Sequence, residues 1–207
     1  MRASSRVVPV LVIPLIALSG CAQSSNVDPA SAGADGGTSS RPPALSSVEP
    51  EPDGAVAGTP FEADTEPDVA QPSADARLTV SDVRVAAQDG YDRVVFELGG
   101  DGTPGWDVRY VDQAYVPGSG QAVEVVGGGV LEFRLNGAGY PFETGVDEYP
   151  GREPLRAPDT SAVTEVIFQA TYEGTTTAFI GTRDRTPFRV SFLENPARVV
   201  VDVAPAG

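Results

Sequence analysis

The sequence predicts an all-β fold: an antiparallel β-sandwich of about eight or nine short strands, preceded by a disordered tether. Three observations lead to this fold class. Apolar and polar residues alternate with a period of two over most of residues 77–207. Clusters of turn-forming residues, such as Pro117-Gly118-Ser119-Gly120, separate the alternating runs. No window carries the apolar stripe of an amphipathic helix.

The first 20 residues have the layout of a lipoprotein signal peptide. Arg2 and Arg6 precede the apolar run Val7–Leu18, which is shorter than the about 20 residues of a membrane-spanning helix. The run leads into Leu18-Ser19-Gly20-Cys21, which resembles the lipobox of bacterial lipoproteins. Cys21 is therefore expected to carry diacylglycerol and palmitate, and to anchor the protein on the extracytoplasmic face of the cell membrane. A chance cysteine after an ordinary signal peptide is the alternative.

Residues 22–76 are expected to form a disordered linker between Cys21 and a folded domain at 77–207. The linker is rich in Pro, Ser, Ala, Gly and acidic residues, with Phe61 as its one aromatic residue and Arg41 as its one base. Such a composition buries too little apolar surface to offset the conformational entropy lost on folding. A partner-binding motif hidden in the linker is the alternative.

The folded domain is expected to consist of about nine strands joined by tight turns. Val94, Phe96 and Leu98 share one face of their strand, and Val201 lies on the apolar face of the last strand. These side chains are expected in the core. The strand candidates are 78–85, 91–98, 106–111, 122–126, 130–135, 163–172, 175–180, 188–192 and 199–203.

The composition argues against several classes of function. The chain has a formal net charge of −15, with 14 basic residues that are all arginine, no histidine and one cysteine. This acidic balance disfavours nucleic acid and anionic lipid surfaces, both of which need a basic footprint. Without histidine no Ser-His pair can form, and a single cysteine makes neither an intrachain disulfide nor a Cys-rich zinc site. No metal and no cofactor are therefore expected.

The acidic residues leave two further possibilities. Paired carboxylates can hydrolyse glycosides, and oxygen ligands can bind calcium. However, the sequence has no Asp-rich loop with calcium-binding spacing, and solvation of an acidic surface explains the carboxylates better. We therefore expect a domain without catalytic activity. The carboxylates concerned are Asp101, Glu132, Glu143, Asp147, Glu148 and Glu153.

Residues 136–162 interrupt the alternating pattern with an irregular stretch that contains four prolines. Irregular segments longer than about 12–15 residues are usually functional or disordered, and the aromatic residues of this one favour packing against the domain. Two hypotheses follow: the aromatic residues fasten the segment to the sandwich, or they form a ligand surface together with nearby strand residues. A place in the core is the alternative for Trp106. The candidate ligand-binding residues are Trp106, Tyr110, Tyr140, Phe142, Tyr149, Arg152 and Arg156.

Five stretches carry a family resemblance. They are "DGYDRVVFEL", "PGWDVRYVD", "GYPFETGVDEYPG", "TEVIFQATYEGTTTAFIG" and the closing hairpin "PFRVSFLENPARVVVDV". In this order and spacing they are similar to the AMIN-like domain of actinobacterial secreted proteins and lipoproteins, over residues 78–203.

The resemblance implies a β-sandwich module that localises envelope proteins, such as cell-wall amidases and secretins, and that binds peptidoglycan or other wall components. It implies no catalytic residues. We therefore expect an extracytoplasmic lipoprotein whose domain binds peptidoglycan or another cell-wall component. The alternative is a scaffold or accessory subunit that docks another envelope protein, for example by strand addition at a sheet edge.

Replacement of Cys21 by alanine is expected to release the protein from the membrane, because the thiol that receives the lipid is lost. Cell fractionation and mass spectrometry of the purified protein measure this. A Cys21→Ala variant that stays in the membrane fraction as firmly as the wild type, with no loss of lipid mass, would contradict the lipoprotein assignment.

Overall fold

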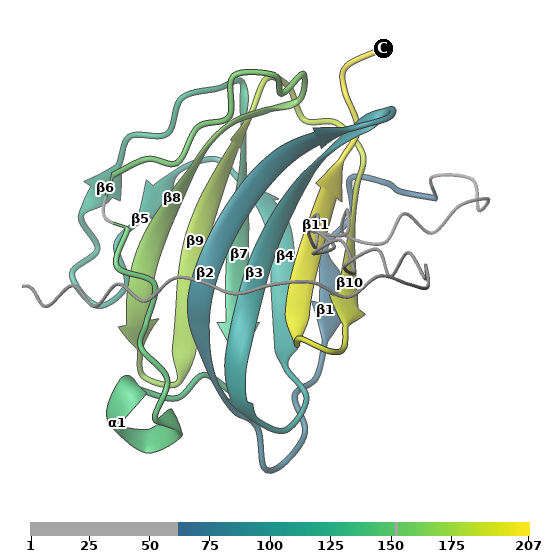
Figure 1. Ribbon diagram of the computed structural model, residues 1–207. Helices are drawn as coiled ribbons and strands as arrows, with labels where there is room; N and C mark the ends of the chain where they lie inside the picture. Colours follow the sequence, from purple (N-terminus) through teal and green to yellow (C-terminus); the bar gives the residue numbers. More distant parts are fainter. Residues whose placement is uncertain (1–61, 152) are drawn as a thin grey trace, which may run out of the picture. The chain divides into compact units, whose positions relative to one another are not determined.

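The computed structural model describes residues 62–207, with the exception of position 152. Two antiparallel β-sheets pack face to face, with the apolar core between them (Figure 1). The five-stranded sheet has the order β1-β4-β7-β9-β8, and the four-stranded sheet has the order β10-β11-β3-β2. Strands β5 and β6 form a small two-stranded sheet. The predicted all-β sandwich is therefore confirmed.

Each of the nine strand candidates coincides with a strand, although the candidate at 122–126 shrinks to two residues. The sequence does not predict β1, β5 or the four-residue helix α1, because such short elements show no periodicity. No helix among the described residues is long and apolar enough to cross a membrane. The elements are β1 (Asp68–Ala70), β2 (Arg77–Gln88), β3 (Tyr91–Asp101), β4 (Gly105–Val111), β5 (Ala114–Tyr115), β6 (Ala122–Val123), β7 (Gly129–Asn136), α1 (Pro141–Thr144), β8 (Val163–Tyr172), β9 (Thr175–Thr182), β10 (Phe188–Leu193) and β11 (Arg198–Val203).

The centre of the core is a stack of two phenylalanine rings, one from each sheet. Phe96 of β3 and Phe133 of β7 lie parallel, with 3.9 Å between their ring centroids, and both are fully buried. Val94 and Leu98 flank Phe96 on the same face of β3, and Val201 of β11 is also buried in this cluster. The faces predicted from the period-two pattern are thus the faces that meet.

The folded body begins before Arg77, where the sequence analysis ends the linker. Asp64 pairs with Phe188 at the edge of β10, and β1 pairs with β4 in the five-stranded sheet. The Asp68 carboxylate also accepts hydrogen bonds from Trp106 of one sheet and from the Val190 amide of the other. These partners are distant in sequence, so the local composition of residues 62–76 does not reveal them. Cys21 and the earlier part of the linker lie outside the described residues.

A second, smaller apolar cluster lies on the outer face of the five-stranded sheet. Phe179 of β9 and Ile167 of β8 point away from the main core, and Ala114 of β5 covers them. Val123, Val125 and Val130 are partly buried and pack against this cluster. The segment that contains β5 and β6 therefore folds back over the sheet, and it covers only part of that outer face.

Charged side chains cross the outer face of the four-stranded sheet. Arg93 of β3 binds both carboxylate oxygens of Asp202 on β11, at 2.7 and 3.0 Å, and Arg189 of β10 binds the same carboxylate at 2.9 Å. The side chain of Asp202 is 1 % exposed. A buried carboxylate is stable only with such partners. Through these two ion pairs, Asp202 links three adjacent strands.

Replacement of Phe133 by alanine is expected to lower the free energy of unfolding by about 3–5 kcal/mol, because it removes half of the central ring stack and leaves a cavity. Denaturant unfolding followed by circular dichroism measures this loss. Phe142, which is 83 % exposed, gives the matched control, and Phe142→Ala should unfold like the wild type. Equal stability of the Phe133→Ala variant and the wild type would contradict this account of the core.

Candidate ligand-binding groove

Trp106 and Tyr110, two of the candidates from the sequence, point into the sandwich. The Trp106 indole donates a 2.9 Å hydrogen bond to Asp68 and packs against the core, as the core alternative for this residue expects. The Tyr110 hydroxyl donates to the Thr186 carbonyl oxygen at 2.8 Å and accepts from the Thr186 amide at 3.0 Å, while its ring meets Phe188 edge-on. Both residues fasten β4 to neighbouring segments.

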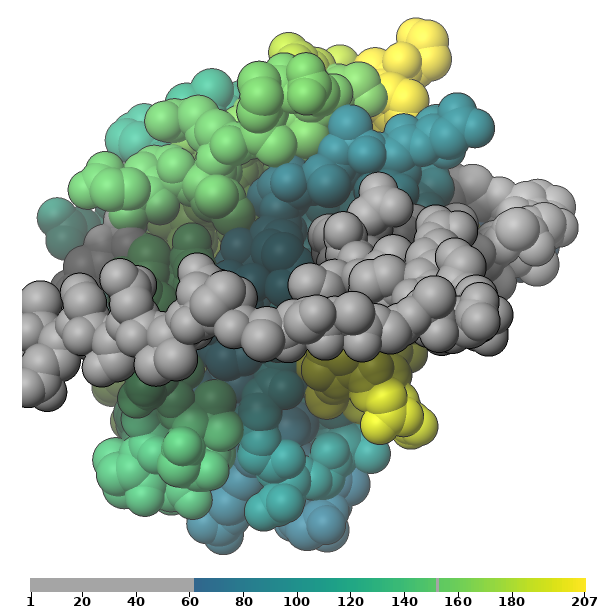
Figure 2. Space-filling model, in the orientation of Figure 1, coloured from purple at the N-terminus to yellow at the C-terminus, as the bar shows by residue number. Residues whose placement is uncertain are grey.

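The irregular segment between β7 and β8 closes one side of the sandwich. The Tyr149 amide donates to the Val80 carbonyl oxygen in β2 at 2.8 Å, and its ring packs edge-on against Phe168 of β8. Further along, Leu155 pairs with Val166 of β8 through two hydrogen bonds. Figure 2 shows parts of this green segment at the surface, at the lower end and at the upper end of the domain. It thus fills the gap between the edge strands β2 and β8.

Arg156 of this segment forms an ion pair with Glu165 of β8. Glu165 is 1 % exposed, and its other carboxylate oxygen accepts a 2.8 Å hydrogen bond from the Val126 amide. One buried acid therefore holds both the long segment and the segment after β6 against the sheet. Arg152, the other candidate arginine, lies outside the described residues.

Tyr140 and Phe142 lie at the start of this segment. Their rings stack at 5.4 Å, and Phe142 is 83 % exposed. Glu143 fixes the pair, since its carboxylate accepts a hydrogen bond from the Tyr140 amide at 2.9 Å and caps α1. The Tyr140 hydroxyl accepts a 3.3 Å hydrogen bond from the amide of Glu173, in the turn between β8 and β9.

The structure does not bring the sequence-predicted candidates together on one surface. Trp106 and Tyr110 belong to the core, because the alternation of β4 turns both rings inward. Tyr149 fastens the segment, which agrees with the first of the two hypotheses for this aromatic residue. Ligand binding by Tyr140, Phe142 or Arg156 stays a prediction.

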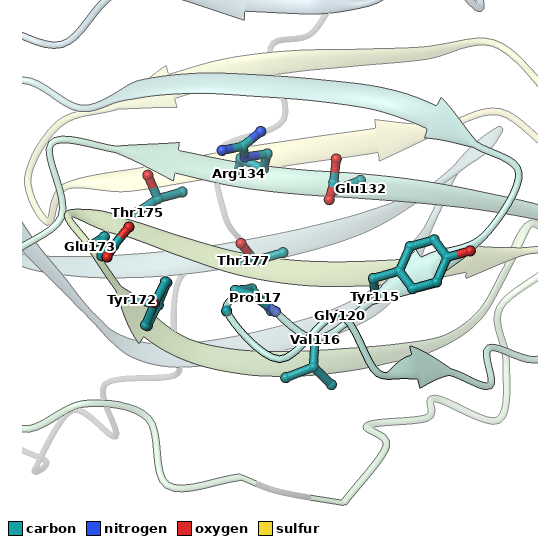
Figure 3. A pocket seen from close by; sticks show the side chains of 11 residues that line it. Tyr115, Val116, Pro117, Gly120, Glu132, Arg134, Tyr172, Glu173, Thr175 and Thr177 are labelled. Carbon is teal, nitrogen blue, oxygen red and sulfur yellow. The ribbon is translucent and has the colours of Figure 1, made fainter.

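A groove of about 410 Å³ lies on the outer face of the five-stranded sheet, beside the segment that carries β5 and β6. The sheet provides its floor, and the turn that follows β5 forms one wall (Figure 3). The residues that line it are Tyr115, Val116, Pro117, Gly118, Gly120, Glu132, Arg134, Tyr172, Glu173, Thr175 and Thr177.

Two half-exposed tyrosines flank the groove. Tyr115 is 54 % exposed and Tyr172 is 45 % exposed, and Figure 3 shows them on either side of Pro117. Gly118 lets the turn lie against the Tyr172 ring: its φ is +79°, and a Cβ atom there would lie 2.8 Å from the ring. Both facts favour glycine at this position.

Polar side chains of the groove come from two adjacent strands and one turn. Glu132 and Arg134 lie on the outer face of β7, Thr177 lies opposite Arg134 on β9, and Glu173 and Thr175 lie at the turn between β8 and β9. The groove therefore offers hydroxyl groups, two carboxylates and one guanidinium between two aromatic walls. Such a set suits a polyhydroxylated ligand with an apolar ring face.

The sequence analysis does not select these residues. Glu132 and Arg134 alternate with core residues of β7, as any solvent-facing pair in a strand does. Tyr115 stands just before the Pro-Gly turn, which is the one local signal, but the fold-back of residues 113–128 is a tertiary event. As to metals, the described part of the chain contains no group of three or more Asp, Glu, Cys or His residues that could hold an ion.

A comparison with protein-family models matches residues 78–205 to the AMIN-like domain. This match covers most of the chain and nearly all of the sandwich. The chain belongs to the AMIN-like domain family. Comparisons with curated proteins and with solved structures give no significant match.

The AMIN-like domain family is a non-catalytic, targeting-type family that acts in the cell envelope, and membership suggests an extracytoplasmic location. The match covers β2 to β11 and leaves out β1, which precedes residue 78. The groove, the central ring stack and the long segment between β7 and β8 all lie within the AMIN-like region.

Replacement of Arg156 by alanine is expected to lower the free energy of unfolding by about 1–3 kcal/mol, since it leaves the buried Glu165 carboxylate with less compensation. Adding Glu165→Gln should recover part of the loss, because a neutral side chain needs no cation. Denaturant unfolding of both single variants and the double variant measures the coupling. An Arg156→Ala variant of wild-type stability that binds wall material poorly would instead make Arg156 a ligand contact.

Proposed function

We propose that this protein is a membrane-anchored lipoprotein whose AMIN-like domain binds a cell-wall polymer, peptidoglycan in the first place, in the groove beside Tyr115 and Tyr172. The observation that carries this proposal is the pair of half-exposed tyrosines on either side of a polar groove. Aromatic rings offer the C–H face of a sugar a large contact area at low entropic cost. The hydroxyl and carboxylate groups of the floor suit the hydroxyl groups of the same sugar.

The position of the groove fits an extended ligand. It lies on an outer sheet face and is open to solvent, and its volume of about 410 Å³ is large enough for one or two sugar units of a longer chain. An enclosed cavity would accept only the end of a polymer. An open groove on the sheet surface can accept a unit from the middle of a polymer chain.

The anchor and the groove would act together. Cys21 would hold the chain at the membrane, and the residues between Cys21 and the sandwich, rich in Pro, Ser and Gly, would set the reach of the domain. A groove of modest affinity is sufficient in this arrangement, because the anchor keeps the domain close to the wall and raises the effective concentration.

Docking of another envelope protein is the second candidate function, and the exposed Phe142 ring favours it. Strand addition at the edges formed by β10 and β8 is a poorer mode for this domain. Asp64 and Asp68 bind the Phe188 and Val190 amides at the edge of β10, and Leu155 pairs along β8. Edges occupied in this way offer few free amides to an incoming strand.

Replacement of Tyr115 and Tyr172 by alanine is expected to weaken binding to purified sacculi by about tenfold to a hundredfold, because both aromatic walls are lost. A sedimentation assay with the non-lipidated Cys21→Ala protein measures this. The melting temperature should change by only a few degrees, since both side chains are about half exposed.

Val69→Ala gives the matched control, because Val69 is a half-exposed apolar residue on β1, outside the groove. Wild-type binding by the Tyr115→Ala/Tyr172→Ala variant would contradict the proposal. Crosslinking in cells separates the second candidate: a protein partner that is lost on Phe142→Ala, with no sacculus binding by the wild type, would favour docking of a protein.

A further inference from the structure

Arg134 occupies the groove with a guanidinium that has no partner within the described part of the chain. No hydrogen bond, ion pair or ring contact joins it to another described residue. Every other arginine that the structure describes contacts an acidic side chain or a carbonyl oxygen. Arg134 is thus the one described arginine that contacts neither an acid nor a carbonyl oxygen, although the chain has a net charge of −15.

An acidic residue lies directly opposite Arg134 on the neighbouring strand. Asp107 of β4 is its cross-strand neighbour, and Thr177 is its neighbour on the other side in β9. Directly opposed side chains on one face lie about 4.5–5.5 Å apart at their Cβ atoms, and opposite charges at such positions pair readily. Arg134 and Asp107 would therefore be expected to form an ion pair.

Asp107 is instead bound by Arg109, which lies on the same strand. The Arg109 Nε atom donates to Asp107 Oδ1 at 2.7 Å, and Nη2 donates to Oδ2 at 2.6 Å. Hydrogen bonding to Asp107 and the charge of that carboxylate raise the pKa of Arg109. These two hydrogen bonds engage both carboxylate oxygens of Asp107. The Arg134 guanidinium is therefore available to a ligand in the groove.

We propose that Arg134 is a carboxylate receptor, and that the groove binds a sugar unit that carries one carboxylate beside its hydroxyl groups. This inference rests on the proposed function of the groove. A guanidinium binds a carboxylate through two parallel hydrogen bonds. Glu132 and Glu173, which also line the groove, accept hydrogen bonds from hydroxyl or amide donors of the same unit.

The surrounding charge limits the ligand further. With two carboxylates beside one guanidinium, and a strongly acidic protein around them, a densely charged polyanion is repelled. A single carboxylate in an otherwise neutral unit is accepted. Two kinds of wall sugar have this chemistry: an amino sugar whose lactyl ether or attached peptide bears the acid, and a uronic acid whose ring bears it.

Asp107 and Arg109 are positioning residues in this scheme, since neither lines the groove. Loss of the Arg109 guanidinium would free Asp107 to bind Arg134 across the strands. The ligand would then compete with an internal carboxylate. Arg109→Gln should therefore weaken ligand binding from outside the groove, and adding Asp107→Asn should restore it, which a purely structural role would not predict.

Isothermal titration of the non-lipidated full chain tests the receptor with two matched pairs of probes. The first pair is a peptidoglycan disaccharide-peptide with free carboxylates and the same fragment with carboxamides. The second pair is a uronic acid disaccharide and its reduced neutral form. The wild type should prefer the acid of one pair by about tenfold, and the pair that shows the preference identifies the source of the carboxylate.

Arg134→Gln should abolish the preference for the acid probe but keep the weaker binding of the neutral probe. Arg134→Lys should keep part of the preference, because the lysine ammonium retains the positive charge but cannot form two parallel hydrogen bonds. Arg84→Gln, which removes an exposed arginine from the other sheet, should keep the full preference. Arg109→Gln should lose about fivefold in acid binding, and Arg109→Gln/Asp107→Asn should regain it.

Equal binding of the acid and neutral probes by the wild type would overturn the inference, as would an unchanged preference in Arg134→Gln. If the wild type still binds sacculi through Tyr115 and Tyr172, the proposed function survives that result. If the wild type binds neither sacculi nor any probe, the proposed function itself fails, and the receptor fails with it. Wild-type behaviour of Arg109→Gln would refute the positioning role of Asp107 and Arg109.

Discussion

The parallel stack of Phe96 on Phe133 is the contact on which the rest of the domain depends. It joins the middle of the four-stranded sheet to the middle of the five-stranded sheet, and both rings are fully buried. The two flat rings are in face-to-face contact, and aliphatic side chains fill the space around them. Because the inner faces of both sheets form the core, only the outer faces and the sheet edges can bind a ligand or other segments of the chain.

Each outer face is used differently. On the four-stranded sheet, Asp202 accepts two arginines and ties three strands together. On the five-stranded sheet, the segment with β5 and β6 covers Phe179 and Ile167 and leaves the groove beside it. Glu165 acts as a pin between this segment and the long segment after β7. The buried acids thus work as joints between segments, and none of them belongs to the groove.

The arrangement is consistent with a targeting module of the AMIN-like family. The chemistry that it offers consists of aromatic faces, hydroxyl groups and a few charges on a rigid sheet, which suits recognition of a polymer. Arg134 is the cation that lines the groove, and Asp107, its neighbour on β4, is bound by Arg109 of the same strand. In the scheme proposed above, this pairing within β4 decides what β7 offers to a ligand. Rigid strands make such a choice definite, since cross-strand neighbours have fixed partners.

The sequence by itself determined the fold class, nine of the strands and the composition of the core, because a period-two pattern records which face of each strand is buried. It also carried the stretches that mark the AMIN-like family, and the lipobox-like motif at Cys21 from which a lipid anchor is predicted. Only the tertiary structure decided that the folded body includes Asp64 and Asp68, that Trp106 and Tyr110 point inward, and that the segment after β5 folds over the sheet. These features depend on partners far apart in the chain. The same holds for the groove, which is lined by Tyr115, Arg134 and Tyr172 from three separate segments. A local sequence pattern therefore could not predict it.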